Sequence, residues 1–481
     1  MRTISCAHLI ETAQAPVARA RRIHIQNDRV HAVDSAAPEQ VQPLFALPAL
    51  VNAHDHGRAV RTSSIGAGGK PLEAWLHYLA LFPSVDPYAA AIVALSHAAL
   101  GGAGSVMVHY TRVQGFTDLP TEAAAVAHAA REVGVRVGFA VAMRDRNPLV
   151  YGPSEPVLAM LPPPARAEIE QRLLRKPLPP AEFIALVDAV AAAAAGPMFD
   201  VQYGPNGVQW CSEPLLTAVA EASQRTGRRV HMHLLESRYQ RAWADQAYPQ
   251  GVVRHLDAIG LLSPRLTLAH CVFARQDELE LLAERGVTIV VSSSSNLHLH
   301  NGVAPVSRMI ACGCKVALGI DGNALDDDDD ALREIRLAHL LHIGSGFAAG
   351  VSREQMLQIA FGNGRVSVSN VDDGGAIAAG APADLLLLDW AAIDDDGLRD
   401  DIDALELVFK RATARHIREL IVNGRTIVKD GTVLSADLPA ARQAVLAQMR
   451  AGAQANAAFA AALPPLERAI AAHYEPDSAC V

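Results

Sequence analysis

The sequence predicts an α/β protein with a (β/α)₈ barrel of TIM type and a small β-sandwich domain built from both chain ends. Three observations lead to this fold class. Eight short apolar runs alternate with Ala- and Leu-rich stretches over about 320 residues, the number and size expected of such a barrel. Patterns of strands and turns occupy the two chain ends instead. The length of 481 residues accommodates one large barrel and a small second domain.

The first predicted element is a hairpin over residues 21–34, where apolar and polar residues alternate on both sides of an Asn-Asp turn. A buried strand over residues 43–51 follows it. The other barrel strands are predicted at residues 105–109, 136–143, 199–204, 229–234, 266–270, 287–292 and 315–320. Helical patterns lie between them, such as residues 121–133, 181–195 and 213–226. The alternative is an open doubly wound sheet, but the sequence has no Gly-rich dinucleotide-binding turn after its first strand.

After the barrel, residues 383–389 and 419–428 return to strand-and-turn patterns, and a helical tail follows. We therefore expect three parts. The predicted parts are a small β domain from residues 1–48 and 379–432, a barrel from residues 49–378, and a helical tail from residues 433–481. Five consecutive aspartates at residues 326–330 are expected to form a solvated loop or the N-terminus of a helix, where carboxylates complement the helix dipole.

Composition and charge exclude several classes of partner. The chain carries 42 Lys and Arg residues against 51 Asp and Glu residues, for a formal net charge of -9 and no basic stripe, so no nucleic acid is expected to bind. No stretch of eighteen apolar residues is free of charges and no signal peptide is evident, so no membrane contact is expected. The 6 cysteines show no zinc-ribbon spacing, which indicates reduced thiols and a cytoplasmic protein.

Histidines and carboxylates mark the ends of several predicted strands. His54 and His56 follow the first barrel strand, and residues i and i+2 of a strand point to the same face. His233 lies on the fifth barrel strand with Glu236 just beyond it. His270 ends the next strand and Asp321 follows the last one. In barrels of this class catalytic residues come from the C-terminal ends of different strands, so these side chains are expected to converge on one site.

Neutral imidazoles with one carboxylate are ligands that suit zinc first and iron(II) second. We expect one divalent metal ion per chain, held by His54, His56, His233 and Asp321, with a position left for water. A metal lowers the pKa of such a water towards about 7. Asp321 is expected to take the proton of the water, Glu236 to carry a proton to the substrate, and His270 to polarise the water or the developing oxyanion.

Two alternatives remain open at this point. His231 lies two residues from His233 on the same face, so spacing alone does not say which of them binds metal. We choose His233 because Glu236 follows it in an HxxE pattern. Asp321 could instead cap a helix, because the segment GIDGNAL precedes a helical pattern.

These residues occur in motifs that resemble the amidohydrolase superfamily over nearly the whole chain. The resemblance is closest to the branch of cytosine and guanine deaminases, S-adenosylhomocysteine deaminase and triazine hydrolases. The matching segments are LPALVNAHDH (47–56), HMHLLES (231–237), LAHCV (268–272), SSSSNLHLHNGVAPV (292–306), LGIDGNAL (318–325) and APADLLLLD (381–389). The resemblance implies a barrel with a mononuclear metal site on the same residues. The binuclear members carry a carboxylated lysine on the fourth strand, and the segment FDVQYGPNG has no lysine.

The sequence pattern supports the predicted substrate contacts less strongly than the predicted metal ligands. Trp75 and Glu73 match a segment that contacts substrate in the resembling proteins, although Trp75 could equally be helix core. Arg144 could bind an anionic or carbonyl-rich group, with a surface ion pair as the alternative. The amides of Asn206, Gln209 and Asn296 could read the edge of a heterocycle. Asn206 also stands where nucleoside deaminases of this branch usually carry a histidine.

The sequence therefore predicts a hydrolase that removes ammonia from a small amino-substituted N-heterocycle, of the purine, pyrimidine, pterin or triazine type. The ligand spacing supports metal-dependent hydrolysis, and the resemblance supplies the substrate class and an expected homodimer. One alternative is a cyclic amide or triazine C–N or C–Cl hydrolase with the same mononuclear site. A more remote alternative is a non-catalytic metal-binding barrel, which would not need Glu236 and His270.

Overall fold

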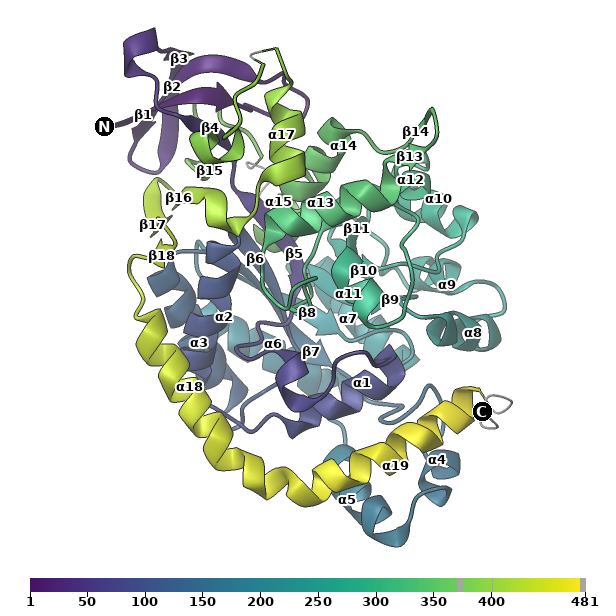
Figure 1. Cartoon of the computed structure of the whole chain (residues 1–481). Coiled ribbons are helices and arrows are strands. Elements are labelled where there is room, and N and C mark those ends of the chain that lie inside the picture. Colours follow the sequence, from purple (N-terminus) through teal and green to yellow (C-terminus); the bar gives the residue numbers. More distant parts are fainter. Residues whose placement is uncertain (370–374, 400, 476–481) are drawn as a thin grey trace.

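Two eight-stranded sheets form the framework of the protein in the computed structural model, which describes residues 1–369, 375–399 and 401–475. The first sheet is a nearly closed parallel barrel in which the strands follow one another in chain order from β5 to β12 (Figure 1). Its strands are β5 (Leu50–Asp55), β6 (Ala103–Tyr110), β7 (Arg136–Met143), β8 (Phe199–Pro205), β9 (Val230–Leu234), β10 (Leu266–His270), β11 (Thr288–Val291) and β12 (Lys315–Leu318). The predicted barrel is confirmed.

The first and last barrel strands meet at the residues of the predicted site. The backbone N–H groups of Ile320 and Asp321 donate to the His54 carbonyl at 3.2 and 2.9 Å. The Asn52 side chain adds a bond, because its Oδ1 accepts from the Ile320 N–H at 2.9 Å. Gly319 is needed for this approach, since a Cβ there would lie 2.9 Å from the Cβ of His54. This seam brings the ends of β5 and β12 together.

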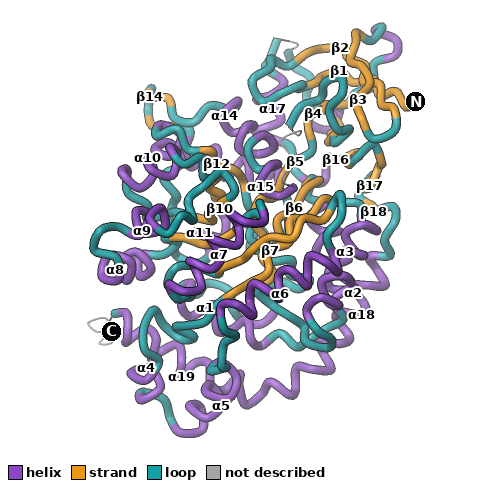
Figure 2. The backbone as a smooth tube through the Cα atoms, turned by 180° about the vertical axis from the view of Figure 1, so that it is seen from behind, coloured by secondary structure: helices purple, strands orange, loops and turns teal. Residues whose placement is uncertain are grey.

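Helices surround the barrel, and Figure 2 shows α3, α6 and α7 lying over its strands. The helices are α1 (Leu72–Tyr78), α2 (Pro87–Leu100), α3 (Leu119–Val133), α4 (Glu155–Ala159), α5 (Pro163–Leu173), α6 (Pro180–Ala194), α7 (Glu213–Thr226), α8 (Arg238–Ala247), α9 (Val252–Ala258), α10 (Gln276–Glu284), α11 (Ser293–His298), α12 (Val306–Ala311), α13 (Ala331–His342), α14 (Arg353–Leu357) and α15 (Arg365–Ser369). Between α13 and α14 lies a short hairpin, β13 (Gly344–Ser345) and β14 (Ala348–Ala349).

Caps in the sequence explain where the predicted helices begin and end. The Asp118 side chain accepts from the Thr121 N–H before α3, and Ser212 does the same for Leu215 before α7. Gly134 and Gly227 end these helices in the left-handed conformation, at φ of 92° and 71°. In the aspartate run, Asp330 is the N-cap of α13, while Asp326 is exposed. Since α13 begins at Ala331, Asp321 does not cap it, and that alternative is wrong.

The second sheet takes its strands from both ends of the chain, in the order β18-β17-β16-β15-β4-β1-β2-β3. Its strands are β1 (Arg2–Leu9), β2 (Ala18–Gln26), β3 (Arg29–Ser35), β4 (Leu44–Pro48), β15 (Leu385–Asp389), β16 (Ile417–Val422), β17 (Arg425–Lys429) and β18 (Thr432–Val433). The predicted hairpin is confirmed as β2 and β3, which pair in antiparallel register. Two further helices, α16 (Trp390–Ile393) and α17 (Ala404–Arg411), lie between β15 and β16. The predicted domain boundaries stay a prediction.

The prediction of one strand over residues 43–51 is wrong. The segment forms two strands that belong to different sheets, with Ala49 between them. β4 pairs with β1 and β15 in the terminal sheet, while β5 pairs with β6 in the barrel. Both halves are apolar and largely buried, so the pattern reads as one strand, although Pro48 at the end of β4 marks the junction. The Ala49 N–H donates to the Asp384 carbonyl at 3.1 Å, which places the break beside β15.

A buried ionic cluster joins the terminal sheet to the barrel. The Asp384 carboxylate, 8% exposed, accepts from Arg136 on β7 at 3.2 Å and from Arg365 on α15 at 2.5 Å. The backbone N–H of Asn423 donates to it at 2.6 Å. Burial opposes ionisation of Asp384, but the two arginines hold its pKa below its usual value. The carboxylate therefore stays charged and bridges both sheets.

Asp384→Ala is expected to lower the free energy of unfolding by about 3–5 kcal/mol, because it removes the carboxylate that two buried guanidinium groups share. Urea unfolding followed by circular dichroism measures this loss. The control is Asp188→Ala, which removes the half-exposed partner of Arg228 and should cost less than about 1 kcal/mol. Equal effects of the two substitutions would contradict the bridging role.

Two helices, α18 (Leu438–Ala453) and α19 (Ala457–Tyr474), lie in the predicted tail; α18 begins near β18 of the terminal sheet and runs down beside the barrel, and α19 crosses the end away from that sheet (Figure 1). The five described cysteines, at positions 6, 211, 271, 312 and 314, are free, and Cys480 lies outside the described residues. Within the described ranges, no helix combines the length and hydrophobicity needed to cross a membrane.

Candidate metal centre and active-site cavity

All six predicted metal and catalytic residues lie at the C-terminal ends of barrel strands. His54 ends β5 together with Asp55, and His56 follows directly. His233 lies on β9, His270 is the last residue of β10, and Asp321 follows β12. The sixth residue, Glu236, comes just after β9. Because the strands are parallel, their ends meet on one face of the barrel.

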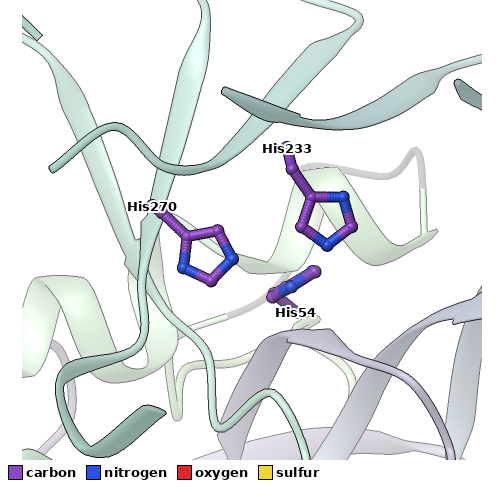
Figure 3. Close-up of side chains that lie close together, drawn as sticks. All are labelled: His54, His233 and His270. Atoms are coloured by element: carbon purple, nitrogen blue, oxygen red, sulfur yellow. The ribbon is translucent and has the colours of Figure 1, made fainter. Parts of the chain in front are cut away.

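The side chains of these residues converge. His56 Nε2 lies 3.0 Å and His54 Nε2 lies 3.3 Å from the same oxygen, Asp321 Oδ1. Side-chain atoms that could ligate a metal lie within 4.8 Å of one another in three overlapping groups. The groups are His54, His56 and Asp321; His54, His233 and His270; and Glu236, His270 and Asp321. Figure 3 shows the imidazole rings of the second group turned towards one another.

Each imidazole is held through its Nδ1 atom, which leaves Nε2 facing the centre. His56 Nδ1 donates to the His109 carbonyl at 2.9 Å, and His233 Nδ1 donates to the Asn206 carbonyl at 2.7 Å. His270 Nδ1 donates to the side-chain oxygen of Asn296 at 3.0 Å. Outer partners of this kind fix the tautomer and ring orientation of metal-binding histidines.

His231 and His233 take different places, although they share a strand face. His231 Nε2 shares a hydrogen bond of 2.8 Å with His54 Nδ1, and the two rings stack. His231 therefore lies behind His54 and occurs in none of the three groups of possible ligands. This geometry favours His233 over His231 as the ligand and gives His231 the task of orienting His54.

The protonation states suit cation binding. Burial lowers the pKa of His233 well below its usual value and that of His270 to about 3, so both imidazoles are neutral at pH 7. Burial opposes ionisation of Asp321, but the adjacent His54 and His56 hold its pKa well below the usual range. The centre thus combines neutral nitrogen donors with one carboxylate, the state in which these groups ligate a metal.

Unpaired polar atoms also indicate that the residues of the centre fit a metal ion. Three deeply buried atoms of the centre, His54 Nε2, His270 Nε2 and Asp321 Oδ1, have no hydrogen-bond partner among the described residues. Buried polar atoms are normally paired, and each unpaired one needs an explanation. A cation between the Nε2 atoms and the carboxylate oxygen would satisfy all three, with ligand types that suit zinc.

Polar neighbours hold the two carboxylates in place. The Ser295 hydroxyl donates to Asp321 Oδ2 at 2.6 Å, which leaves Oδ1 to face the histidines. Asn301 Nδ2 donates to Glu236 Oε1 at 3.0 Å, and the backbone N–H of Glu236 donates to the Gln240 side chain at 2.8 Å. Burial raises the pKa of Glu236 well above its usual value, and the nearby carboxylates add to this effect.

Three residues at or beside the site have a left-handed backbone conformation. His270 and Asp321 have φ of 74° and 62°, and Leu235 beside Glu236 has φ of 50°. Side chains other than glycine rarely adopt this left-handed region, and such strain gathers at functional sites. This strained backbone directs the His270 and Asp321 side chains into the centre. The sequence pattern did not predict the strain.

A cavity of about 330 Å³ opens over the centre. Ligand pockets of proteins begin at about this size and are mainly apolar with a few converging polar groups. Its floor is formed by His56, His233, Glu236, His270 and Asp321, and its walls include Trp75, Trp210, Tyr151 and Tyr474 with the arginines Arg58, Arg112 and Arg144. Flat aromatic walls of this kind suit a planar ligand.

The structure brings three of the five predicted substrate contacts to the cavity. Trp75, Arg144 and Asn206 line it, whereas Gln209 and Asn296 do not. The Asn296 side chain holds His270 instead, so it supports the centre from behind. The Arg144 guanidinium lies 5.9 Å from the Trp210 ring centroid and donates to the Asn147 carbonyl at 2.9 Å.

Sequence reasoning missed two residues of the site. His109 is the second-last residue of β6, its Nε2 donates to the Gly204 carbonyl at 3.0 Å, and its ring stacks on His233. Its place at the end of a predicted strand was the same signal that identified His270. Arg58 donates to the Asp321 carbonyl at 2.7 Å, and its guanidinium lies 5.0 Å from the Trp75 ring centroid. Nothing in the pattern distinguished it.

Glu334 on α13 anchors the first turn of helix α11, which carries Ser295. Its carboxyl accepts from the Ser294 N–H at 3.0 Å and from the Ser294 hydroxyl. Burial raises the pKa of Glu334 from 4.5 to about 7. Between these values the folded protein binds more protons than the unfolded chain, so the stabilisation is complete below 4.5 and is lost as the pH rises through about 7.

We therefore expect the free energy of unfolding to fall by up to about 3 kcal/mol between about pH 5 and pH 8 through this carboxyl group. Urea unfolding at a series of pH values measures the slope. Glu334→Gln should flatten the slope, because the amide keeps the acceptor oxygen but does not titrate. The same slope in both proteins would assign the pH dependence to other groups.

The chain is similar to a known family and to several known proteins. A sequence profile described as the amidohydrolase family matches residues 45–427. The chain is 32% identical over 245 residues to a 5'-deoxyadenosine deaminase of Methanosarcina barkeri, which covers 51% of this chain and 56% of that protein. It is 28% identical to a 5-methylthioadenosine/S-adenosylhomocysteine deaminase of Moorella thermoacetica, over 86% of this chain and 91% of that protein.

The alignment thus spans little more than half the length of the M. barkeri protein. Among solved structures, a mutant of atrazine chlorohydrolase TrzN from Arthrobacter aurescens, crystallised with zinc and atraton, superimposes with a TM-score of 0.77. The superposition covers 93% of this chain and 100% of that chain at 22% sequence identity, so it shows that the two proteins share a fold.

Proposed function

Because this chain belongs to the amidohydrolase family, we propose that it is a metal-dependent deaminase of a small amino-substituted N-heterocycle. The substrate is of the purine, pyrimidine, pterin or triazine type. The observation that carries the proposal is the convergence of His56, His233, His270, Glu236 and Asp321 on the floor of an aromatic cavity, with His54 directly beneath them in the same cluster of possible ligands. The two relatives named as deaminases support the reaction type.

We propose that His54, His56, His233 and Asp321 hold one divalent metal, for which this donor set favours zinc over iron(II). When bound, the metal would lower the pKa of a water to about 7 and so supply a nucleophile at neutral pH. His270 also belongs to a group of possible ligands, and we assign it a different role: its Nδ1 donates to Asn296, so its Nε2 lone pair can accept a hydrogen bond from the attacking water.

Proton transfer is assigned to the two carboxylates. Asp321 Oδ1 faces the histidines and takes the proton of the water as its oxygen attacks the amidine carbon. Glu236, whose pKa burial raises, delivers its proton to the ring nitrogen. Asp321 then passes the proton it took to the amino group, and the hydroxyl proton of the adduct returns to Glu236. The C–N bond breaks, ammonia leaves, and the ring retains a carbonyl group. Trp75 and Trp210 provide apolar faces on the walls of the cavity for the ring.

The test is ammonia release by purified protein loaded with zinc. The panel is adenine, guanine, cytosine, pterin and melamine, and the metal content is measured on the same sample. Ammonia from one class, at about one metal per chain, would support the proposal and identify the substrate group. Bound metal without ammonia from any compound would favour ring-amide or C–Cl hydrolysis, which chloride release and ring-opening assays then test. Absence of bound metal would refute the site. Size-exclusion chromatography tests the predicted homodimer.

A further inference from the structure

The C-terminal helix α19 forms part of the cavity wall, although it lies beyond the part of the chain that the family profile matches. Its last residue, Tyr474, lines the cavity. The helix contacts α1, α4 and α5, and both views show it running beside α4 and α5 (Figures 1 and 2). Phe459 and Ile470 of α19 pack with Val157 and Ile169 in one buried cluster. The helix is therefore fixed to the mouth of the barrel.

A row of aromatic rings connects Tyr474 to the metal centre. The ring centroid of Tyr474 lies 5.7 Å from that of Tyr151, and Tyr151 lies 5.8 Å from Trp210. Trp210 in turn lies 6.4 Å from His233, edge to face. These separations are typical of aromatic pairs that stabilise one another. The row makes one continuous wall from the end of α19 down to His233.

Polar contacts hold the middle and the C-terminal end of α19 against the substrate site. Glu467 accepts from Lys70 at 2.9 Å and from the Tyr78 hydroxyl at 2.7 Å, which ties the helix to the segment that carries Trp75. Just after its last residue, Glu475 pairs with Arg238 at the start of α8. The same α8 follows directly after Glu236.

The contacts of Tyr474 lead on to the predicted proton shuttle. The backbone N–H of Tyr151 donates to the Tyr474 hydroxyl oxygen at 2.8 Å. The Tyr151 hydroxyl donates to Glu73 at 2.9 Å and accepts from Gln240 at 3.3 Å. Gln240 accepts from the backbone N–H of Glu236 at 2.8 Å. Tyr474 is thus connected to Glu236 through Tyr151 and Gln240.

We propose that Tyr474 is a specificity-determining residue, which closes the cavity at the end away from the metal centre and so limits the size of the substituent that a heterocyclic substrate can carry. This inference rests on the proposed function for the identity of the substrate. The wall itself rests on geometry alone. The site therefore includes a side chain from the last described helix of the chain.

The first test compares Tyr474→Ala with wild type on the best compound of the panel and on its N-butyl derivative. Removing the ring should raise KM for the small compound about 10-fold and shift the preference at least about 10-fold towards the butyl derivative, since one methylene group alone changes selectivity 10–200-fold. Tyr474→Phe keeps the ring and should keep the preference. Arg468→Ala, an exposed change on the same helix, is the matched control and should leave both unchanged. An unchanged preference in Tyr474→Ala would overturn the proposal.

The second test needs no turnover, so it separates failure of this inference from failure of the proposed function. Trp75 and Trp210 line the cavity and are 4% and 7% exposed. The other two tryptophans are replaced in the background protein by Trp243→Phe and Trp390→Phe. Acrylamide quenching of the remaining tryptophan fluorescence then reports on Trp75 and Trp210 alone. Tyr474→Ala should raise the quenching constant, and Tyr474→Phe and Arg468→Ala should not. Equal quenching constants in the background protein and its three variants would show that Tyr474 does not close the cavity, and would overturn the proposal. Raised quenching in Tyr474→Ala, with no ammonia from any compound, would support the closed wall and refute only the proposed deaminase activity.

Discussion

Replacing Asp321 by asparagine is expected to abolish deamination, with a fall in kcat of at least about 10⁴-fold, the upper end of what proton transfer alone contributes. The substitution removes both the proton acceptor and the negative charge that faces His54 and His56. Metal affinity should also fall by more than the 10–100-fold that the loss of an outer partner typically costs. Ammonia release and metal analysis on one sample measure both effects.

The control is Asp326→Asn, the same chemical change at an exposed position. Far-ultraviolet circular dichroism should show that both variants keep their secondary structure, because the strands that hold Asp321 are joined by backbone hydrogen bonds. Near-normal turnover of Asp321→Asn would remove this residue from the mechanism. Normal metal content without turnover would leave it as a base but not as a ligand.

Glu236→Gln is expected to separate proton transfer from metal binding. The amide can still accept from Asn301, so the side chain should keep its place. It cannot deliver a proton, and the rate should fall by about 10²–10⁴-fold while the metal content stays at about one per chain. Steady-state kinetics and metal analysis measure the two quantities separately.

Glu280→Gln, an exposed change on α10, is the matched control and should have no effect on either quantity. Loss of metal in Glu236→Gln would place this residue among the ligands, in the group it forms with His270 and Asp321. An unchanged rate would refute its role as a shuttle.

The sequence predicts the barrel well because its strands and helices repeat a local pattern eight times. Caps such as Asp118 and Ser212 mark the helix starts within a few residues. The failure at residues 43–51 has a non-local cause. Nothing in the apolar run tells that its first half pairs with β15, which lies more than three hundred residues further along the chain.

The site could be predicted to a similar depth. Strand-end positions identify His54, His233 and Asp321, because parallel strands bring their C-terminal ends to one face. Which nitrogen each ring presents depends on partners from other elements, such as the His109 carbonyl for His56. The cavity walls depend on loops and on α19, and Tyr474 reaches them only through tertiary packing.

The division of residues 43–51 between two sheets has a consequence for how the protein forms during synthesis. β4 pairs with β15, and these strands lie about 340 residues apart in the chain. At a synthesis rate of about 5–20 residues per second, β4 leaves the ribosome roughly 20–70 s before its partner exists. Throughout that interval its apolar edge stays open while the adjoining barrel strands accumulate. The newly made chain therefore carries a β-strand with one open edge for most of its synthesis, and chaperones that bind extended apolar segments are expected to associate with this part of the protein first.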